Sequence, residues 1–228
     1  MSSTTPDATP KVVLTPVERY LAMYNQFSAI LWSFILMSTT VLAVRNGQPD
    51  VFDTTNFALT VIQSFAVMEI INAIMGFVRT PIFTTVSQVA SRLLIVYGIF
   101  RMLPNSPAGH HWSYLTLTFA WSVTEIVRYS YYAQNLITKG NPARFLTLLR
   151  YNLFFVLYPL GVFSELCIIY LSLDEAKAAI GAEYYYILIG SMALYAPGFY
   201  TLFGHMLKQR KKTMKALYAK EAGEKKQN

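Results

Sequence analysis

The hydrophobic positions of this sequence fall into six long apolar stretches separated by short polar segments. Each stretch is close to the roughly 20 residues that a helix needs to cross the hydrocarbon core of a bilayer. The stretches lie at 20–44, 57–78, 82–100, 113–132, 146–170 and 184–207. The pattern therefore predicts an all-α, polytopic membrane protein with six transmembrane helices in one bundle.

The third stretch is the most polar of the six. A helix that faces the interior of a bundle tolerates a polar face, whereas one that faces lipid does not. We therefore expect this helix to turn inward the face that carries Thr84, Thr85, Ser87, Gln88, Ser91 and Arg92.

The composition agrees with a membrane setting and suggests three regions. Hydrophobic residues make up 54% of the chain and charged residues only 14%, against about 25% charged residues in ordinary soluble domains. Residues 1–19 are rich in Ser, Thr and Pro and have no apolar core, so we expect a disordered tail and not a cleavable signal peptide. The helical domain follows at 20–207, and a basic tail at 208–228. Cys167 is the single cysteine, which excludes an intramolecular disulfide and the usual cysteine zinc site.

Lysine and arginine are distributed unevenly between the two sides of the predicted bundle. If both termini are cytosolic, the inner side carries 14 of these residues and the outer loops carry 3. This bias predicts that both termini lie in the cytosol. The net charge of +7 comes mostly from the C-terminal tail, which we interpret as a solvated segment that faces anionic lipid and not as a nucleic-acid site. Lys225 and Lys226 near the end of this tail resemble the dilysine retrieval signal of endoplasmic reticulum membrane proteins.

Five ionisable residues lie inside the predicted spans: Glu69, Arg92, Glu125, Arg128 and Glu165. A charge near the middle of the bilayer costs about 2.5 to 3.5 kcal/mol on insertion scales unless it is paired or solvated within the protein. We therefore expect these side chains to converge inside the bundle.

Residue spacing places some of these groups on common helix faces. Glu125 and Arg128 are three residues apart, which is equally typical of a purely structural ion pair. Gln88 and Arg92 are four residues apart, and neither neutralises the other. Arg92 therefore needs a carboxylate from another helix, and Glu69 is the nearest along the sequence.

The segment "LYPLGVFSE" combines a phenol and a carboxylate in an apolar stretch. Tyr158 and Glu165 are seven residues apart, so a helix places them on one face roughly 10 Å apart. Pro159 removes a backbone donor and crowds the carbonyl of Phe155, and Gly161 permits close approach of another helix, which predicts a kinked helix beside a pocket. A base and an acid that bracket a substrate suit the elimination of water. The alternative is an interfacial tyrosine and a glutamate that serves only helix packing.

A family resemblance follows from these residues. The stretch "LRYNLFFVLYPLGVFSE" resembles the signature of the 3-hydroxyacyl-CoA dehydratases of very-long-chain fatty acid elongation, a family also called protein tyrosine phosphatase-like. Four further stretches agree with it, in order, over residues 57–212: "MEIINAIMGFVRTP", "VSQVASR", "WSVTEIVRYSYYA" and "LYAPGFYTLFGHM".

The resemblance implies a six-span enzyme of the endoplasmic reticulum that converts a long-chain 3-hydroxyacyl-CoA into the trans-2-enoyl-CoA. It implies no metal and no cofactor, and it suggests other elongation-cycle enzymes as partners. The implied catalytic pair is Tyr158 and Glu165. The supporting positions that it implies are Glu69, Gln88, Arg92, Arg128 and Gly161. Asn72 departs from the family, which usually has a histidine at this position.

A mechanism follows as a hypothesis. Glu165 removes the C2 proton and Tyr158 protonates the departing 3-hydroxyl group, although the reverse assignment is also open. The developing enolate needs a positive partner, for which Arg92 and Arg128 are both candidates. Counted from a helix start at Leu146, Tyr158 lies about 18 Å deep and Glu165 about 28 Å deep, unless the helix begins nearer to Tyr151.

Other functions remain as alternatives or are excluded by missing motifs. Desaturases and condensing elongases use several histidine boxes, but the only histidines are His110, His111 and His205. A phosphatase of the cysteine type needs an arginine six residues after its nucleophile, and Cys167 is followed there by Leu173. A proton-coupled transporter and a non-catalytic scaffold of the elongation complex both remain open.

Overall fold

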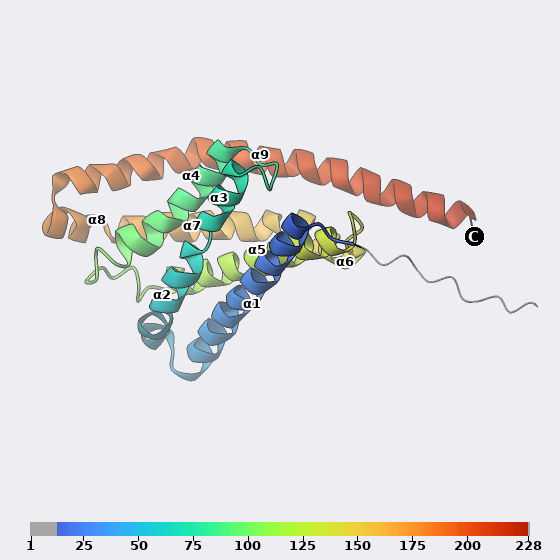
Figure 1. Cartoon of the computed structure of the whole chain (residues 1–228). Helices are drawn as coiled ribbons and strands as arrows, with labels where there is room; N and C mark the ends of the chain where they lie inside the picture. The colour runs from blue at the N-terminus through green and yellow to red at the C-terminus, as the bar shows by residue number, and fades with distance from the viewer. Residues whose placement is uncertain (1–12, 228) are drawn as a thin grey trace, which may run out of the picture.

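The structure, a computed structural model, describes residues 13–227, and within this range all the regular secondary structure is helical (Figure 1). This confirms the predicted all-α class. In chain order the elements are α1 (Pro16–Arg45), α2 (Gln48–Ser64), α3 (Val67–Ile74), α4 (Ile82–Leu93), the π-helical turn η1 (Leu94–Ile99), α5 (Trp112–Ile137), α6 (Arg144–Asn152), α7 (Phe154–Leu171), α8 (Leu173–Glu175), the π-helical turn η2 (Ala176–Ile180) and α9 (Ala182–Gln227).

Several helices have the length and composition of membrane spans, as the sequence predicts. Within the described residues five segments are long and apolar enough to cross a membrane: Pro16–Arg45, Asp50–Ile74, Ile82–Ile99, Phe154–Ile180 and Ala182–Lys220. The remaining long helix, α5, carries Glu125 and Arg128. It packs against α1 and α7, so its polar residues lie inside the bundle.

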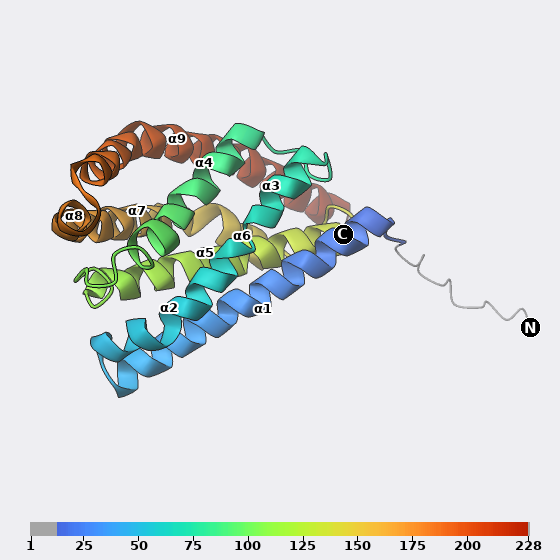
Figure 2. The same ribbon diagram turned by 60° about the vertical axis from the view of Figure 1, so that its left-hand side comes forward.

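The helix ends gather at two opposite ends of the bundle (Figure 2). At one end Lys139 Nζ, just after α5, lies 2.7 Å from the carboxylate of Glu18 at the start of α1. At the other end the hydroxyl groups of Ser106 and Ser172 are 2.7 Å apart and join the segments before α5 and after α7. The two ends of the bundle are therefore held by separate sets of polar contacts.

Helix α1 has an exposed apolar face and a buried face of different composition. Its large apolar side chains at Met23, Ile30 and Met37 recur every seven residues and are 64%, 65% and 65% exposed. Its buried face instead mixes Trp32 and Ile35 with small polar residues such as Ser28. Helices pack in lipid through close van der Waals contact and small residues, because lipid is as apolar as the helix surface. The exposed stripe therefore fits a face that touches lipid.

The first helix begins earlier than the sequence analysis expected. Helix α1 starts at Pro16, four residues before the expected boundary at Tyr20. The cause is a capping box: the Thr15 hydroxyl accepts from the Glu18 backbone N–H at 3.2 Å, and the Glu18 carboxylate accepts from the Thr15 N–H at 2.8 Å. The predicted disorder of residues 1–12 lies outside the described part of the chain.

The last helix continues without a break from its apolar part into the basic C-terminal region. Arg210 Nε donates to Asn152 Oδ1 at 2.9 Å, and Met214 is buried. The boundary expected after Leu207 is therefore a change in composition and not a change in backbone structure. The side chains of Lys225 and Lys226 lie outside the described residues.

Candidate active site

Helix α7 carries the predicted catalytic pair. The helix runs without interruption through Pro159, where a kink was expected. The single residue Leu153 separates α7 from the preceding helix α6. Gly161 is buried against α5, where an added Cβ atom would lie 3.9 Å from Ala120 Cβ and 3.9 Å from Trp121 Cδ1. The expected close approach at Gly161 is therefore made by α5.

Glu165 is buried, and each of its carboxylate oxygens accepts one hydrogen bond. Trp121 Nε1 of α5 donates to Oε1 at 2.9 Å, and the Tyr195 hydroxyl of α9 donates to Oε2 at 2.6 Å. Both donors are neutral, so they orient the carboxylate without cancelling its charge. Neither residue was among the predicted site residues, although both occur in the stretches "WSVTEIVRYSYYA" and "LYAPGFYTLFGHM" that carry the family resemblance.

Tyr158 lies on the same side of α7 as Glu165. Its ring stacks on Phe199 at a centroid distance of 5.2 Å and an interplanar angle of 15°, with Phe203 next in the stack. Tyr195, Phe199 and Phe203 follow one another at four-residue spacing, so they form one face of α9. Both members of the pair therefore contact the same face of the same helix.

The hydroxyl group of Tyr158 is available for a ligand. The side chain is half-buried, and within the described residues its hydroxyl makes no hydrogen bond to the protein. Most buried phenols use their polar atom within the fold. Tyr195 does so with Glu165, which makes Tyr158 the phenol free to donate outward from the site.

The other ionisable residues form a chain of ion pairs across three helices. Glu125 accepts from Arg92 Nη1 at 2.5 Å and from Arg128 Nε at 2.6 Å. Arg128 also donates from both Nη atoms to the two oxygens of Glu69, at 2.9 and 2.5 Å, and the Tyr129 hydroxyl donates to Glu69 as well. The expected convergence is present for these four charges.

One expected pairing is wrong. Glu69 is the carboxylate nearest to Arg92 along the sequence, but Arg92 pairs with Glu125, and Glu69 pairs with Arg128. The reason is the position of the helices: α5 brings Arg128 to Glu69 of α3, where both Nη atoms reach its carboxylate, and α4 brings Arg92 to Glu125 instead. The suggested Glu125–Arg128 pair within α5 is present.

Arg92 connects this ion-pair chain to the predicted catalytic carboxylate. Its guanidinium lies 5.0 Å from the ring centroid of Trp121, the residue that donates to Glu165. Gln88, one turn earlier on α4, is exposed, and none of its described contacts brings its side chain to Glu165. The inward orientation expected for the polar face of this helix therefore holds for Arg92 and fails for Ser87 and Gln88, which are both exposed.

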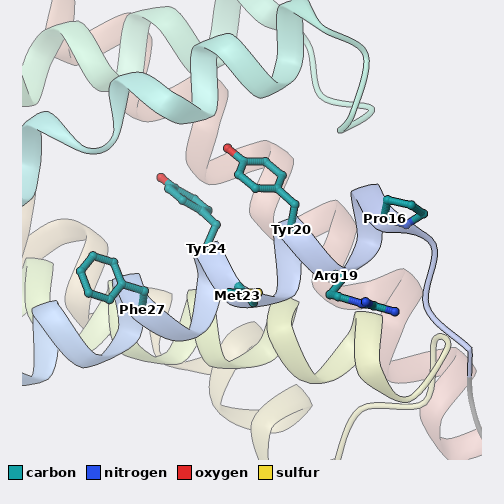
Figure 3. Close-up of a pocket in the computed structure, with 6 residues that line it drawn as sticks. All are labelled: Pro16, Arg19, Tyr20, Met23, Tyr24 and Phe27. Atoms are coloured by element: carbon teal, nitrogen blue, oxygen red, sulfur yellow. The ribbon is translucent and has the colours of Figure 1, made fainter.

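Asn72, which replaces the usual family histidine, has a packing role. It is buried, and its Oδ1 accepts from the Tyr20 hydroxyl at 3.2 Å, which ties α3 to α1. A surface hollow of about 630 Å³ lies along the same part of α1, where Tyr20 and Tyr24 point toward the overlying helix (Figure 3). Neither Tyr158 nor Glu165 lines this hollow.

The described residues hold no group of three or more His, Cys, Asp or Glu side chains placed to bind a metal ion. The expectation that the site works without metal or cofactor stays a prediction. What the arrangement offers chemically is one unpaired carboxylate, one free phenol and one partly engaged arginine.

Comparison with known proteins adds a family match. Residues 63–216 match the family described as "Protein tyrosine phosphatase-like protein, PTPLA". This range includes Glu69, Gln88, Arg92, Arg128 and the whole of α7.

Curated relatives extend over most of the chain. Very-long-chain (3R)-3-hydroxyacyl-CoA dehydratase hpo-8 of Caenorhabditis elegans is 38% identical over 212 residues, which cover 87% of this chain and 95% of the relative. A probable very-long-chain (3R)-3-hydroxyacyl-CoA dehydratase of Schizosaccharomyces pombe is 37% identical, over 89% of this chain and 96% of the relative. Very-long-chain (3R)-3-hydroxyacyl-CoA dehydratase 1 of Mus musculus is 31% identical, over 86% of this chain and 73% of the relative. No solved structure matches this chain.

Proposed function

Because the chain belongs to the protein tyrosine phosphatase-like (PTPLA) family, whose curated relatives are named very-long-chain (3R)-3-hydroxyacyl-CoA dehydratases, we propose that it is a hydro-lyase acting on this substrate class. The observation that carries the proposal is which of the three carboxylates inside the bundle are paired with arginine. Glu69 and Glu125 are paired with arginines, whereas Glu165 meets only the neutral donors Trp121 and Tyr195 among the described residues. Glu165 is therefore the carboxylate with its charge left for chemistry.

The proposed reaction removes water from C2 and C3 of the acyl chain. Glu165 takes the C2 proton to leave an enolate, and the electron pair of that enolate then forms the C2–C3 double bond as the C3–O bond breaks. The Tyr158 phenol protonates the departing hydroxyl group, which leaves as water. Transfer of the proton from Glu165 to the Tyr158 phenolate then restores the enzyme, so the reaction needs no oxidant and no cofactor.

Arg92 is the proposed positive partner of the developing enolate. Arg128 uses its Nε and both Nη atoms on Glu125 and Glu69, whereas within residues 13–227 Arg92 is hydrogen-bonded through Nη1 alone. Donors placed where charge develops in the transition state are a large source of rate enhancement. The remaining donors of Arg92, beside Trp121, are the ones placed to act in this way.

The other implied positions receive supporting roles. Gly161 lets α5 bring Trp121 to Glu165, and Glu69 with Arg128 fixes the position of Glu125 and hence of Arg92. Gln88 is exposed one turn from Arg92, and its supporting role stays a prediction.

The proposed topology has six spans, with α5 as the sixth. The alternation of the helix ends between two ends of the bundle supports it, as does the central position of α5 between α1 and α7 (Figure 2). Both termini are placed in the cytosol by the lysine and arginine bias. Lys225 and Lys226 support residence in the endoplasmic reticulum, where the other elongation-cycle enzymes are the proposed partners.

The start of α7 gives the site a shallow depth. Tyr158 lies four residues and Glu165 eleven residues after Phe154, which corresponds to about 6 Å and about 16 Å along the helix. These distances are shorter than those counted from Leu146, because the apolar candidate span begins at Phe154 and leaves out α6. A CoA head that stays in water therefore needs only its pantetheine arm to enter the bundle.

The function is tested by turnover of a long-chain (3R)-3-hydroxyacyl-CoA by the purified full chain in nanodiscs. We expect Tyr158→Phe and Glu165→Gln each to lower kcat by about a hundredfold or more, because each removes a proton-transfer group. Matched controls are Tyr170→Phe, an exposed phenol on α7, and Glu183→Gln, an exposed carboxylate at the start of α9. Full activity of either site variant, or no turnover by the wild-type chain alone, would contradict the proposal, and the second result would favour a scaffold.

A second measurement separates the base from the acid. When the general acid is missing, the hydroxyl group cannot leave, but the base can still remove the C2 proton. In D₂O this proton is then replaced by deuterium. We therefore expect Tyr158→Phe to keep deuterium incorporation at C2 and Glu165→Gln to lose it. The opposite pattern would reverse the two roles.

A further inference from the structure

The C-terminal part of α9 has two unlike faces. Lys208, Lys211, Lys212 and Lys215 are spaced three, four and seven residues apart, so they lie on one side of the helix, here called the lysine face. All four side chains are exposed. Among the described residues none of the four has an ion-pair or hydrogen-bond partner, so their charges are not used inside the protein.

The opposite face is docked on the rest of the protein. Arg210 donates to Asn152 at 2.9 Å, and its guanidinium lies 5.3 Å from the ring centroid of Phe155. Met214, one turn later, is buried. At 100° per residue, Arg210 and Met214 continue the face of α9 that turns Tyr195, Phe199 and Phe203 toward α7. This docking fixes the rotation of α9 and points the lysine face away from Tyr158 and Glu165.

The lysine face continues the most exposed side of the apolar part of α9. Ile187, Leu194 and Tyr200 are 59%, 71% and 83% exposed, and helical spacing centres the lysines on the same side of the helix. In a bilayer this apolar side touches lipid. The lysines follow directly after the apolar part, at the depth where lipid headgroups begin.

We propose that the lysine face binds the phosphate groups of anionic lipids, and so holds α9 against α7. The proposal rests on the membrane topology proposed above, in which this end of α9 meets the cytosolic leaflet, where anionic lipids are enriched. Because α9 supplies Tyr195 to Glu165 and Phe199 to Tyr158, an anchor on α9 also steadies the candidate site. The CoA part of the substrate carries phosphates of the same chemistry, so the experiment below includes an arm that distinguishes the two sources.

The direct test is lipid selectivity, measured by electron paramagnetic resonance on the full chain in bilayers with spin-labelled phosphatidylserine or phosphatidylcholine. We expect a larger immobilised fraction for phosphatidylserine, and we expect this preference to fall with added salt. The fourfold Lys→Gln variant at 208, 211, 212 and 215 should lose most of the preference, whereas the fourfold Lys→Arg variant should keep it. An unchanged preference in the Gln variant, with helicity intact by circular dichroism, would overturn the proposal.

A second arm separates lipid phosphate from CoA phosphate. In detergent without anionic lipid, we expect the fourfold Lys→Gln variant to keep the wild-type KM for the acyl-CoA. A KM raised severalfold there, with the phosphatidylserine preference intact, would assign the lysines to the substrate and overturn the lipid site. The spin-label measurement needs no turnover, so it stands even if the wild-type chain proves inactive as a dehydratase.

Discussion

At the scale of single residues, the decisive feature is how each buried carboxylate is neutralised or left charged. Glu125 lies between two guanidinium groups, while the hydrogen bonds to Glu165 in the described part of the chain come from an indole N–H and a phenol. A carboxylate paired with arginine is a weaker base than one held by neutral donors. Trp121 and Tyr195 are therefore positioning residues, since they set the direction in which Glu165 presents its oxygens.

This role of Tyr195 can be measured. We expect Tyr195→Phe to lower kcat about tenfold to a hundredfold, because a hydrogen bond to a charged group is worth about 1.5 to 3 kcal/mol. KM should stay unchanged, and the isotope effect with C2-deuterated substrate should rise as proton removal becomes slower. Tyr184→Phe is the control, because it removes a phenol on the same helix that donates instead to the Gly98 carbonyl at 2.7 Å. An equal loss in both variants would mean that the effect is structural.

At the scale of elements, the site depends on α7 lying between α5 and α9. The α5 side contributes Trp121 beside Gly161, and the α9 side contributes Tyr195 and the ring stack on Tyr158. Small residues let helices approach closely in lipid. The spacing between α5 and α7 therefore controls whether the Trp121 indole reaches Glu165.

Substitution of Gly161 tests this spacing. An added Cβ would meet neighbours at ordinary contact distance, 3.9 Å, so we expect Gly161→Ala to fold and to keep its activity. Gly161→Leu should push α7 from α5 and lower kcat, because the extra atoms have no room there. Gly190→Leu on α9 is the control, since nothing lies within 4 Å of an added Cβ at that position. Full activity of Gly161→Leu would show that the close contact between α7 and α5 at this position is not needed for catalysis.

At the scale of the whole molecule, the ion-pair chain joins the three successive helices α3, α4 and α5. It links Glu69 of α3, Arg92 of α4, and Glu125 and Arg128 of α5. Two positive and two negative groups give the chain no net charge, which makes their burial tolerable inside a membrane protein. It also places the free donors of Arg92 next to the Trp121–Glu165 pair.

Removal of one member of this ion-pair chain should destabilise the whole helical bundle. We expect Arg128→Met to lower the free energy of unfolding by about 3 to 5 kcal/mol, because it leaves two carboxylates against one arginine. The measurement is reversible unfolding in SDS. Arg128→Met combined with Glu69→Gln should recover part of the loss, and Arg101→Met, at an exposed position, should have little effect. A loss no greater than that of Arg101→Met would show that the ion pairs contribute little.

Local patterns in the sequence determined a large part of this picture. Apolar length predicted the spanning helices, the cost of buried charge singled out the five ionisable residues, and seven-residue spacing placed Tyr158 and Glu165 on one face of α7. The early start of α1 was also readable from Thr15, Pro16 and Glu18, because a capping box is a local signal.

Only the tertiary structure decided which residues meet across helices. Spacing along a helix sets the face on which a side chain lies, but the rotation and depth of each helix against its neighbours depend on packing over the whole bundle. For this reason the partner of Arg92 is Glu125 and not Glu69, Gln88 is exposed, and Trp121 and Tyr195 hold Glu165. The sequence located the charges that had to be buried, and helix packing chose their partners.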